Sequence, residues 1–186
     1  MLYFGSMKMN MWHDISRGAT PSELNVIIEI PKGSSNKYEV DKETGLIALD
    51  RANYSAAPYP FDYGFVPQTL WHDGDPLDVV VLTTYPLHPG ILVKVRPVAV
   101  MDMTDTGDSD AKIIAVPVDD KRWEETQDLG DLNKHMLKEF THFWETYKEL
   151  KKGEKGTVTI NGIYDKTKAL DDISTSIKLY DEKYAK

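Results

Sequence analysis

The sequence has 186 residues, a length that suits one domain, and its 41% hydrophobic and 28% charged residues are ordinary for a globular protein. A net charge of −8 argues against binding nucleic acid through a general basic surface, and no apolar run approaches the ~18 residues of a membrane helix. The absence of cysteine excludes disulfides and thiolate metal sites.

The N-terminus carries no basic segment followed by an apolar stretch, so no secretory signal is predicted. We expect a cytoplasmic protein with no membrane and no nucleic-acid partner. Residues 1–6 are typical of a remnant of recombinant expression, with a native start at or near Met7. No internal repeat or low-complexity linker follows, so a single domain is expected over residues 7–186.

The first two thirds of the chain predict β-strands. An apolar-rich run, residues 24–30, stops at Pro31 as a strand would. Two later runs flank the turn-like residues 42–45 and predict a hairpin. The segments expected to be strands are residues 24–30, 37–41, 46–51, 78–82, 91–100 and 112–116.

The last third of the chain changes to helical spacing. Apolar residues recur from Leu132 to Tyr147 and predict an amphipathic helix that ends before Gly153. A short strand is expected at residues 157–160, followed by a second helix whose apolar positions run from 170 to 180. Strands first and helices later indicate an α+β domain rather than an alternating parallel α/β domain.

The most informative segment is the acidic run Asp-Gly-Asp-Pro-Leu-Asp at residues 73–78, directly before the apolar residues 79–82. A second acidic group follows at residues 102–110. Two like charges about 4 Å apart repel by roughly 4 kcal/mol at an effective dielectric near 20. The carboxylates therefore either stay apart in solvent or surround a hard divalent cation. Oxygen-only ligands favour magnesium or manganese over zinc.

Two simpler explanations compete for these acidic segments. One is an Asp-rich surface turn, which is the stronger reading for the second group taken alone. The other is a calcium loop between two helices, which requires Gly at the sixth position and Glu at the twelfth. Counting from Asp73, those positions hold Asp78 and Thr84, so the calcium loop is excluded there.

A magnesium site that acts on phosphate also needs cations and hydroxyls to hold the oxygens. The guanidinium of Arg51 suits bidentate phosphate contact. For Lys37 an exposed cross-strand ion pair is the simpler explanation, and for Lys112 it is an ordinary solvated lysine. Tyr147 lies on the apolar helix face, where core packing is expected. Tyr59 and Tyr63 also have core packing as their simpler explanation.

In this order and spacing, the segments resemble family I soluble inorganic pyrophosphatase, over most of the chain from Ile27 to Lys148. The stretches that carry the resemblance are Ile28-Glu29-Ile30-Pro31, Lys37-Tyr38-Glu39, Asp50-Arg51, Tyr59-Pro60-Phe61-Asp62-Tyr63-Gly64, Asp73-Gly74-Asp75-Pro76-Leu77-Asp78, residues 105–112, Ala115-Val116-Pro117 and His142-Phe143-Trp144-Glu145-Thr146-Tyr147-Lys148. The resemblance implies a five-stranded OB-like β-barrel flanked by C-terminal helices. It also implies a homo-oligomer, most often a homohexamer, and inorganic diphosphate as the substrate.

The resemblance further implies a role for each matching residue. Asp73, Asp78 and Asp110 would hold two Mg²⁺ ions around the attacking water, with Mn²⁺ able to substitute. Asp105 would join Asp110 around further magnesium that arrives with the substrate, and Asp75 would be the general base. The positions that match phosphate-binding residues are Lys37, Arg51, Tyr63, Tyr147 and Lys148, and those that match supporting residues are Glu29, Glu39, Tyr59 and Lys112.

Two other classes of function stay open at the level of sequence. A non-catalytic OB-type module for oligonucleotides would need basic strand faces, and the acidic balance argues against it. A different metal-dependent phosphohydrolase acting on nucleotides would share the chemistry and would accept ATP. Some family members carry an acid where this chain has Thr106, a difference that bears on the number of metal ions bound.

Overall fold

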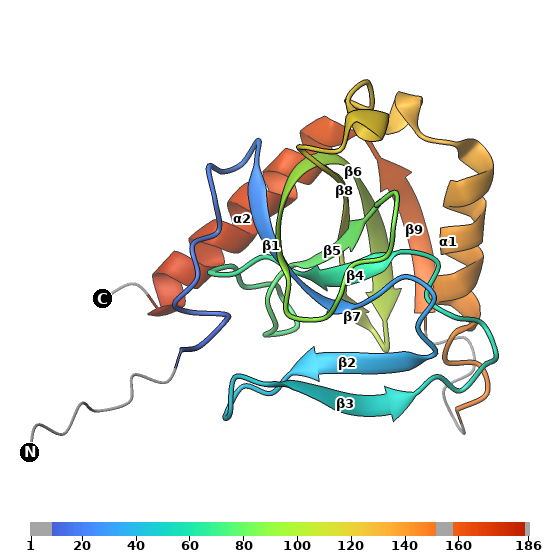
Figure 1. Ribbon diagram of the computed structural model, residues 1–186, viewed down its shortest axis with the longest axis horizontal. Helices are drawn as coiled ribbons and strands as arrows, with labels where there is room; N and C mark the ends of the chain where they lie inside the picture. Colours follow the sequence, from blue (N-terminus) through green and yellow to red (C-terminus); the bar gives the residue numbers. More distant parts are fainter. Residues whose placement is uncertain (1–8, 152–157, 185–186) are drawn as a thin grey trace, which may run out of the picture.

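The computed structural model describes residues 9–151 and 158–184. The expected remnant at residues 1–6 lies outside these ranges, as does the first residue of the strand expected at 157–160. Strands dominate the first part of the chain and helices the last (Figure 1), which confirms the α+β class. The elements are β1 (Leu24–Ile30), β2 (Asn36–Val40), β3 (Ile47–Ala52), β4 (Asp62–Phe65), β5 (Asp78–Val81), β6 (Leu92–Asp105), β7 (Asp108–Ser109), β8 (Lys112–Pro117), α1 (Lys134–Thr146), β9 (Val158–Tyr164) and α2 (Lys166–Tyr184).

Five strands close into a ring in the order β1, β4, β5, β8 and β6, with β6 pairing back to β1. The pairing of β5 with β8 is parallel, and the other four pairings of the ring are antiparallel. Strand β6 has 14 residues and also pairs with β7 and β9 outside the ring. A closed ring of five strands with two helices beside it confirms the OB-like barrel.

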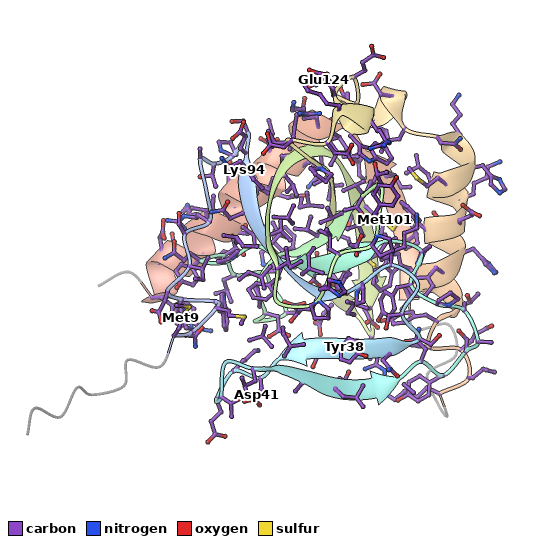
Figure 2. The ribbon with its side chains drawn as sticks, viewed as in Figure 1. Met9, Tyr38, Asp41, Lys94, Met101 and Glu124 are labelled. Carbon is purple, nitrogen blue, oxygen red and sulfur yellow. The ribbon has the colours of Figure 1, made fainter. Side chains whose placement is uncertain are left out.

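Most apolar side chains of the ring pack in two cores, one on each face of the strands, whereas Ile27 and Phe65 pack in a third with Tyr180 of α2. In β5, Val80 packs in the core that includes α1, whereas Val79 and Val81 pack in the core that includes α2. This division follows from the period of two along a strand. Figure 2 shows side chains filling the space within the ring. The acidic run at residues 73–78 therefore leads into a strand that is held from both sides.

Both helices lie where their spacing predicts them. Helix α1 begins after Asn133, whose side-chain oxygen accepts hydrogen bonds from two backbone N–H groups of the first turn, at 2.8 and 3.2 Å. Its buried face carries Phe140, Phe143 and Trp144. Helix α2 follows β9 directly and packs against β6. Within the described residues, no helix combines the length and apolar character needed to cross a membrane.

The predicted hairpin of β2 and β3 forms a separate two-stranded antiparallel sheet. It lies beneath the ring in Figure 1, close to the end of the barrel. Its register places Lys37 opposite Arg51, and a shift in the pairing follows directly after Lys37. The hairpin therefore carries two cationic side chains on neighbouring strands over one end of the barrel.

Strand β4 is not among the strands that the sequence predicts. The chain turns at Pro60 but is extended from Asp62 onward. A Cβ atom at Gly64 would lie 1.9 Å from the carbonyl oxygen of Ile27 on β1, so only glycine permits this approach. Glycine usually weakens a strand, which is why the local sequence gave no strand signal.

The contact at Gly64 predicts a large cost for adding one methyl group there. We expect Gly64→Ala to lower the free energy of unfolding by about 3 kcal/mol, because β1 and β4 must separate to admit the Cβ atom. Urea unfolding measures this change. The matched control is Gly130→Ala, where a Cβ would meet nothing within 4 Å. Equal unfolding midpoints for the two variants would contradict the prediction.

Candidate active site

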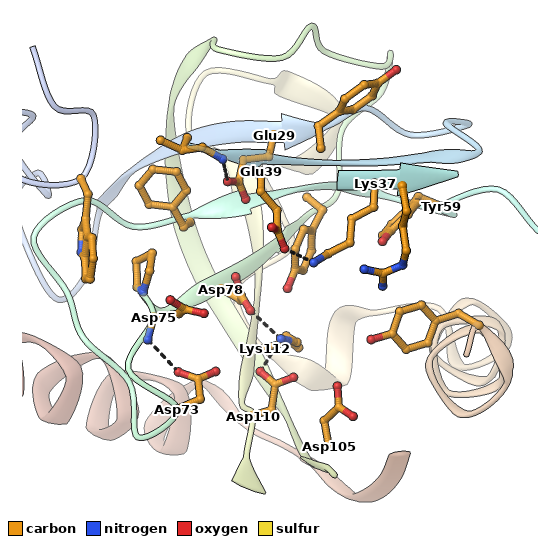
Figure 3. A pocket seen from close by; sticks show the side chains of 18 of the residues that line it. Glu29, Lys37, Glu39, Tyr59, Asp73, Asp75, Asp78, Asp105, Asp110 and Lys112 are labelled. Carbon is orange, nitrogen blue, oxygen red and sulfur yellow. Dashed lines mark hydrogen bonds and ion pairs between the residues drawn. The ribbon is translucent and has the colours of Figure 1, made fainter. Parts of the chain in front are cut away.

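A cavity of about 310 Å³ lies between the end of the barrel and the β2–β3 hairpin. Figure 3 shows its labelled aspartates facing Lys37 and Glu39. Every residue that the sequence nominated for the site lines this one cavity, although the residues come from seven different segments of the chain. They are Glu29, Lys37, Glu39, Arg51, Tyr59, Tyr63, Asp73, Asp75, Asp78, Asp105, Asp110, Lys112, Tyr147 and Lys148.

The first acidic segment is a tight loop between β4 and β5. The backbone N–H of Asp75 donates to Asp73 Oδ1 at 3.0 Å, and the carbonyl of Asp75 accepts from Trp71 N–H at 2.7 Å. Gly74 makes the turn with a φ of 91°, a conformation that favours glycine. Asp78 is the first residue of β5. The loop thus presents three carboxylates to the cavity from a fixed backbone.

The second acidic segment is the β6–β7 hairpin and the residues that follow it. Asp105 ends β6 and pairs with Asp108 across the turn, while Asp110 lies just before β8. The parallel register of β5 and β8 sets Asp78 opposite Lys112, which brings Asp110 close to Asp78. Asp102 and Asp108 do not line the cavity. Of the second acidic group, only the residues at positions 105 and 110 reach the site.

Lys112 is the charge at the centre of this cluster. Its ammonium contacts Asp78 Oδ2 at 2.5 Å and also contacts Asp110. The residue is 3% exposed, which excludes the alternative of an ordinary solvated lysine. Burial alone would lower the pKa of Lys112, but the charges of Asp110 and Asp78 outweigh it and hold that pKa well above its usual value. Lys112 is therefore a permanent cation between two carboxylates.

The pKa values of the carboxyl groups depend on burial and on the nearest cation. Burial, with the charge of Asp110 adding to it, raises the pKa of Asp78 to about 6 against the opposing effect of Lys112. Burial also raises the pKa of Asp73. At Asp105 burial acts in the same direction, but Lys148, 2.5 Å away, outweighs it and lowers the pKa. Each lysine thus favours the ionised form of the carboxyl group beside it.

The hairpin supplies the cations on the opposite side of the cavity. Lys37 contacts Glu39 on its own strand and lies 3.3 Å from Asp50 on β3. Arg51 contacts Asp50 as well, and its guanidinium lies 5.5 Å from the centre of the Tyr54 ring. The ion pair expected for Lys37 is present, yet the same side chain lines the cavity. Lys37 can therefore form ion pairs with Glu39 and Asp50 and still line the cavity.

The three nominated tyrosines likewise belong to the core and to the cavity at once. Tyr59, Tyr63 and Tyr147 are no more than 6% exposed and pack in one cluster with the aromatic residues of α1. Burial raises the pKa of each above its usual value, so their hydroxyls stay protonated and can donate hydrogen bonds. The core packing expected for them is what fixes these donors in the cavity wall.

The donor chemistry of the cavity suits a hard cation. Its aspartates offer only carboxylate oxygens, which are the ligands that magnesium and manganese prefer. As the side chains stand in residues 9–151 and 158–184, no three acidic or histidine side chains form a ligand cluster. The ammonium of Lys112 lies between two of the candidate ligands. The residues therefore fit metal ions by chemistry, with small side-chain adjustments needed to bring them together.

Several cavity residues escaped the sequence reasoning. Lys42 looked like an ordinary turn residue, and Trp12 lies in a segment without any recognisable pattern. Trp144 fell on the apolar face of α1, where only packing was expected. Tyr38, Pro76 and Trp144 stand in stretches that carry the family resemblance, whereas Lys42 and Trp12 reach the site through tertiary contacts alone. The residues of this kind that line the cavity are Asn10, Trp12, Tyr38, Val40, Lys42, Phe65, Pro76 and Trp144.

Comparisons with known proteins bear directly on this site. The family model described as inorganic pyrophosphatase matches residues 26–181. The chain is 53% identical to an inorganic pyrophosphatase of Leifsonia xyli subsp. xyli over 78% of this chain and 88% of that protein. It is 43% identical to an inorganic pyrophosphatase of Haloferax volcanii over 95% and 99% of the two chains. The crystal structure of an inorganic pyrophosphatase from Thermus thermophilus superposes with a TM-score of 0.88 at 44% identity, covering 92% of this chain and 99% of that one.

The match spans most of the chain, the barrel and the cavity. This chain belongs to the inorganic pyrophosphatase family, as the resemblance implied. Its enzyme class is that of a hydrolase acting on the diphosphate bond.

Glu29 yields a prediction about pH. Burial raises its pKa to about 8, against the hydrogen bond from Val40 N–H at 2.7 Å, whereas the ordinary value is 4.5. A carboxyl group with a raised pKa stabilises the fold fully below its unfolded pKa and loses that contribution as the pH rises through its folded pKa. We expect Glu29→Gln, in metal-free protein, to gain about 3 kcal/mol relative to the wild type between pH 5 and pH 8.

Urea unfolding of the wild type and the variant at several pH values measures this difference. Glu39→Gln is the matched control, because it makes the same chemical change at a side chain that is half exposed. A constant stability difference between Glu29→Gln and the wild type over pH 5–8 would show that Glu29 is ionised throughout.

Proposed function

We propose that this protein hydrolyses inorganic diphosphate to two phosphates in the cavity beneath the barrel, with Mg²⁺ as the natural metal and Mn²⁺ as a substitute. The observation that carries the proposal is the meeting of carboxylates, cations and buried tyrosine hydroxyls around one small cavity. We further propose that residues 7–186 form a single domain and that the protein works in the cytoplasm as a homohexamer.

The carboxylates would divide the metal ions among them. Asp73, Asp78 and Asp110 would hold two magnesium ions, and Asp105 with Asp110 would hold further ions that arrive with the substrate. Bound magnesium supplies the positive charge that lets an acidic cavity accept an anionic substrate and increases the acidity of a coordinated water. Lys112 contacts both Asp78 and Asp110, so its positive charge offsets the repulsion between these two carboxylates.

Asp75 is the general base in this proposal. It lies between Asp73 and Asp78 in the sequence, and its side chain is 57% exposed, against 23% for that of Asp78, so the attacking water can reach it. Asp75 takes a proton from that water as the water oxygen forms a bond to one phosphorus. The bond from that phosphorus to the bridging oxygen breaks, and the second phosphate leaves.

The cations and hydroxyls around the cavity hold the two phosphoryl groups. Lys37 and Arg51 approach from the hairpin, and Lys148 with Tyr147 approaches from the end of α1. The lysines and the arginine can only donate hydrogen bonds, and the tyrosine hydroxyl is neutral, so all of them suit the oxygens of a phosphate. They stabilise the negative charge that develops on the departing phosphate. Tyr63 donates from the barrel wall. Because these groups belong to different elements, the fold sets the distance between the two phosphoryl subsites.

The supporting residues act through the groups they contact. Glu39 contacts Lys37 and orients its ammonium. Glu29 accepts a hydrogen bond from Val40 N–H and so fixes β2 against β1. Tyr59 packs against Phe143, with ring centroids 4.9 Å apart, and links the barrel wall to α1. Lys112 balances the charges of the metal ligands, as described above.

The proposal is tested by phosphate release from diphosphate. With magnesium we expect rapid release, which a chelator stops, and we expect no release from ATP. Asp75→Asn should lower kcat by about 10²–10⁴ with a much smaller change in KM, because a general base acts in the transition state rather than in substrate binding. Equal losses in kcat and in affinity would contradict the role of Asp75, and release from ATP would favour the nucleotide hydrolase.

A further inference from the structure

The turn between β2 and β3 carries a lysine that reaches the proposed general base. Lys42 follows β2 and lies 33 residues from Asp75 in the sequence, yet its ammonium contacts Asp75 Oδ1. Lys42 also lines the cavity. It is not one of the residues that carried the resemblance to the pyrophosphatase family, and it has no role in the function proposed above.

We propose that Lys42 is a positioning residue that holds the carboxylate of Asp75 in the direction required for proton transfer. This inference rests on the proposed function, because it takes Asp75 to be the general base. The β2–β3 hairpin would then supply Lys37 and Arg51 to the substrate and also position the general base through Lys42.

The contacts of Asp75 show why its side chain needs such a partner. Its backbone is fixed on both sides, by the N–H bond to Asp73 and the carbonyl bond from Trp71. Its side chain, in contrast, is 57% exposed. Among the interactions of the described residues, the Lys42 ammonium is the one side-chain group that holds the Asp75 carboxylate. Without it, the carboxylate could turn freely about its side-chain torsions.

Lys42 is in turn held by Trp12. The Lys42 ammonium lies 5.3 Å from the centre of the Trp12 ring, within the range of a cation–π contact. The Trp12 indole N–H donates to the carbonyl of Thr69 at 2.8 Å. The Thr69 hydroxyl accepts from Leu77 N–H at 2.9 Å, one residue before Asp78. Trp12 is therefore hydrogen-bonded to the loop that carries Asp75. The same loop thus positions the Asp75 carboxylate and, through the Trp12 ring, the Lys42 ammonium.

The solvent exposure of the Lys42–Asp75 ion pair favours a role in positioning the carboxylate over a role in stabilising the fold. The Lys42 side chain is 59% exposed and that of Asp75 57%, and an ion pair so open to solvent contributes little to stability. Its effect should therefore fall on the direction of the carboxylate, to which proton transfer is sensitive. A second possible task for a cavity lysine is direct contact with a phosphate of the substrate, and the two tasks change different kinetic constants.

The test measures kcat and KM for diphosphate, at saturating magnesium, for Lys42→Met and Lys42→Arg in the full chain. We expect Lys42→Met to lower kcat roughly tenfold with KM changed less than twofold, and Lys42→Arg to recover most of the loss. The thermal midpoint should stay close to that of the wild type. The control is Lys121→Met, which breaks an exposed ion pair with Glu124 outside the cavity and should leave kcat and KM unchanged.

A double variant ties the effect to Asp75. If Lys42 acts through the general base, Lys42→Met should lower the residual rate of Asp75→Asn by less than twofold. An unchanged kcat in Lys42→Met beside a strong loss in Asp75→Asn would overturn the inference and leave the proposed function standing. A raised KM with kcat retained would overturn it in favour of substrate binding by Lys42. Full activity of Asp75→Asn would overturn the role of the base and the inference together.

Discussion

The contacts of one buried lysine hold the two acidic segments of this protein together. Asp78 and Asp110 come from segments that are separated by two strands of the chain, and like charges at this range would repel each other. The ammonium of Lys112 offsets that repulsion from within, at 3% exposure, where solvent screens it little. The parallel register of β5 and β8 places Lys112 opposite Asp78. The strand pairing that closes the barrel therefore also brings the carboxylates of the cavity together.

The aromatic cluster under the cavity has a related task. Tyr63 and Trp144 lie 5.6 and 5.5 Å from the Lys112 ammonium and give it a cation–π surface on its apolar side. The same rings pack α1 against the barrel, together with Phe61 and Phe143. Tyr63 and Trp144 therefore both pack the core and stabilise the charge of Lys112. The packing of these rings also fixes the positions of the Tyr63 hydroxyl and the Lys112 ammonium in the cavity wall.

Much of this arrangement could be predicted from the sequence, and the failures have physical causes. Strand β1 ends at Ile30 as expected because Pro31 gives a local stop, and α1 follows its apolar spacing. Strand β6 was expected to end at residue 100 and runs to Asp105, because its polar end pairs with β7 and β9 outside the ring. The burial of Lys112 had no local signal, since it depends on a parallel pairing between distant segments. The family motifs supplied the nominated site residues, whereas Trp12 and Lys42 enter the cavity only through the fold.

The closed ring leaves the protein with few strand edges where another chain could add itself. The five ring strands pair on both sides, so their backbone groups are not a template for further strands. In the described part of the chain, β3 pairs only with β2, and it exposes Leu49. An apolar strand edge of this kind invites aggregation, yet Asp50 and Arg51 stand directly after that leucine. Arg51, which lines the cavity, therefore also acts with Asp50 as a gatekeeper that protects the hairpin against intermolecular β-pairing.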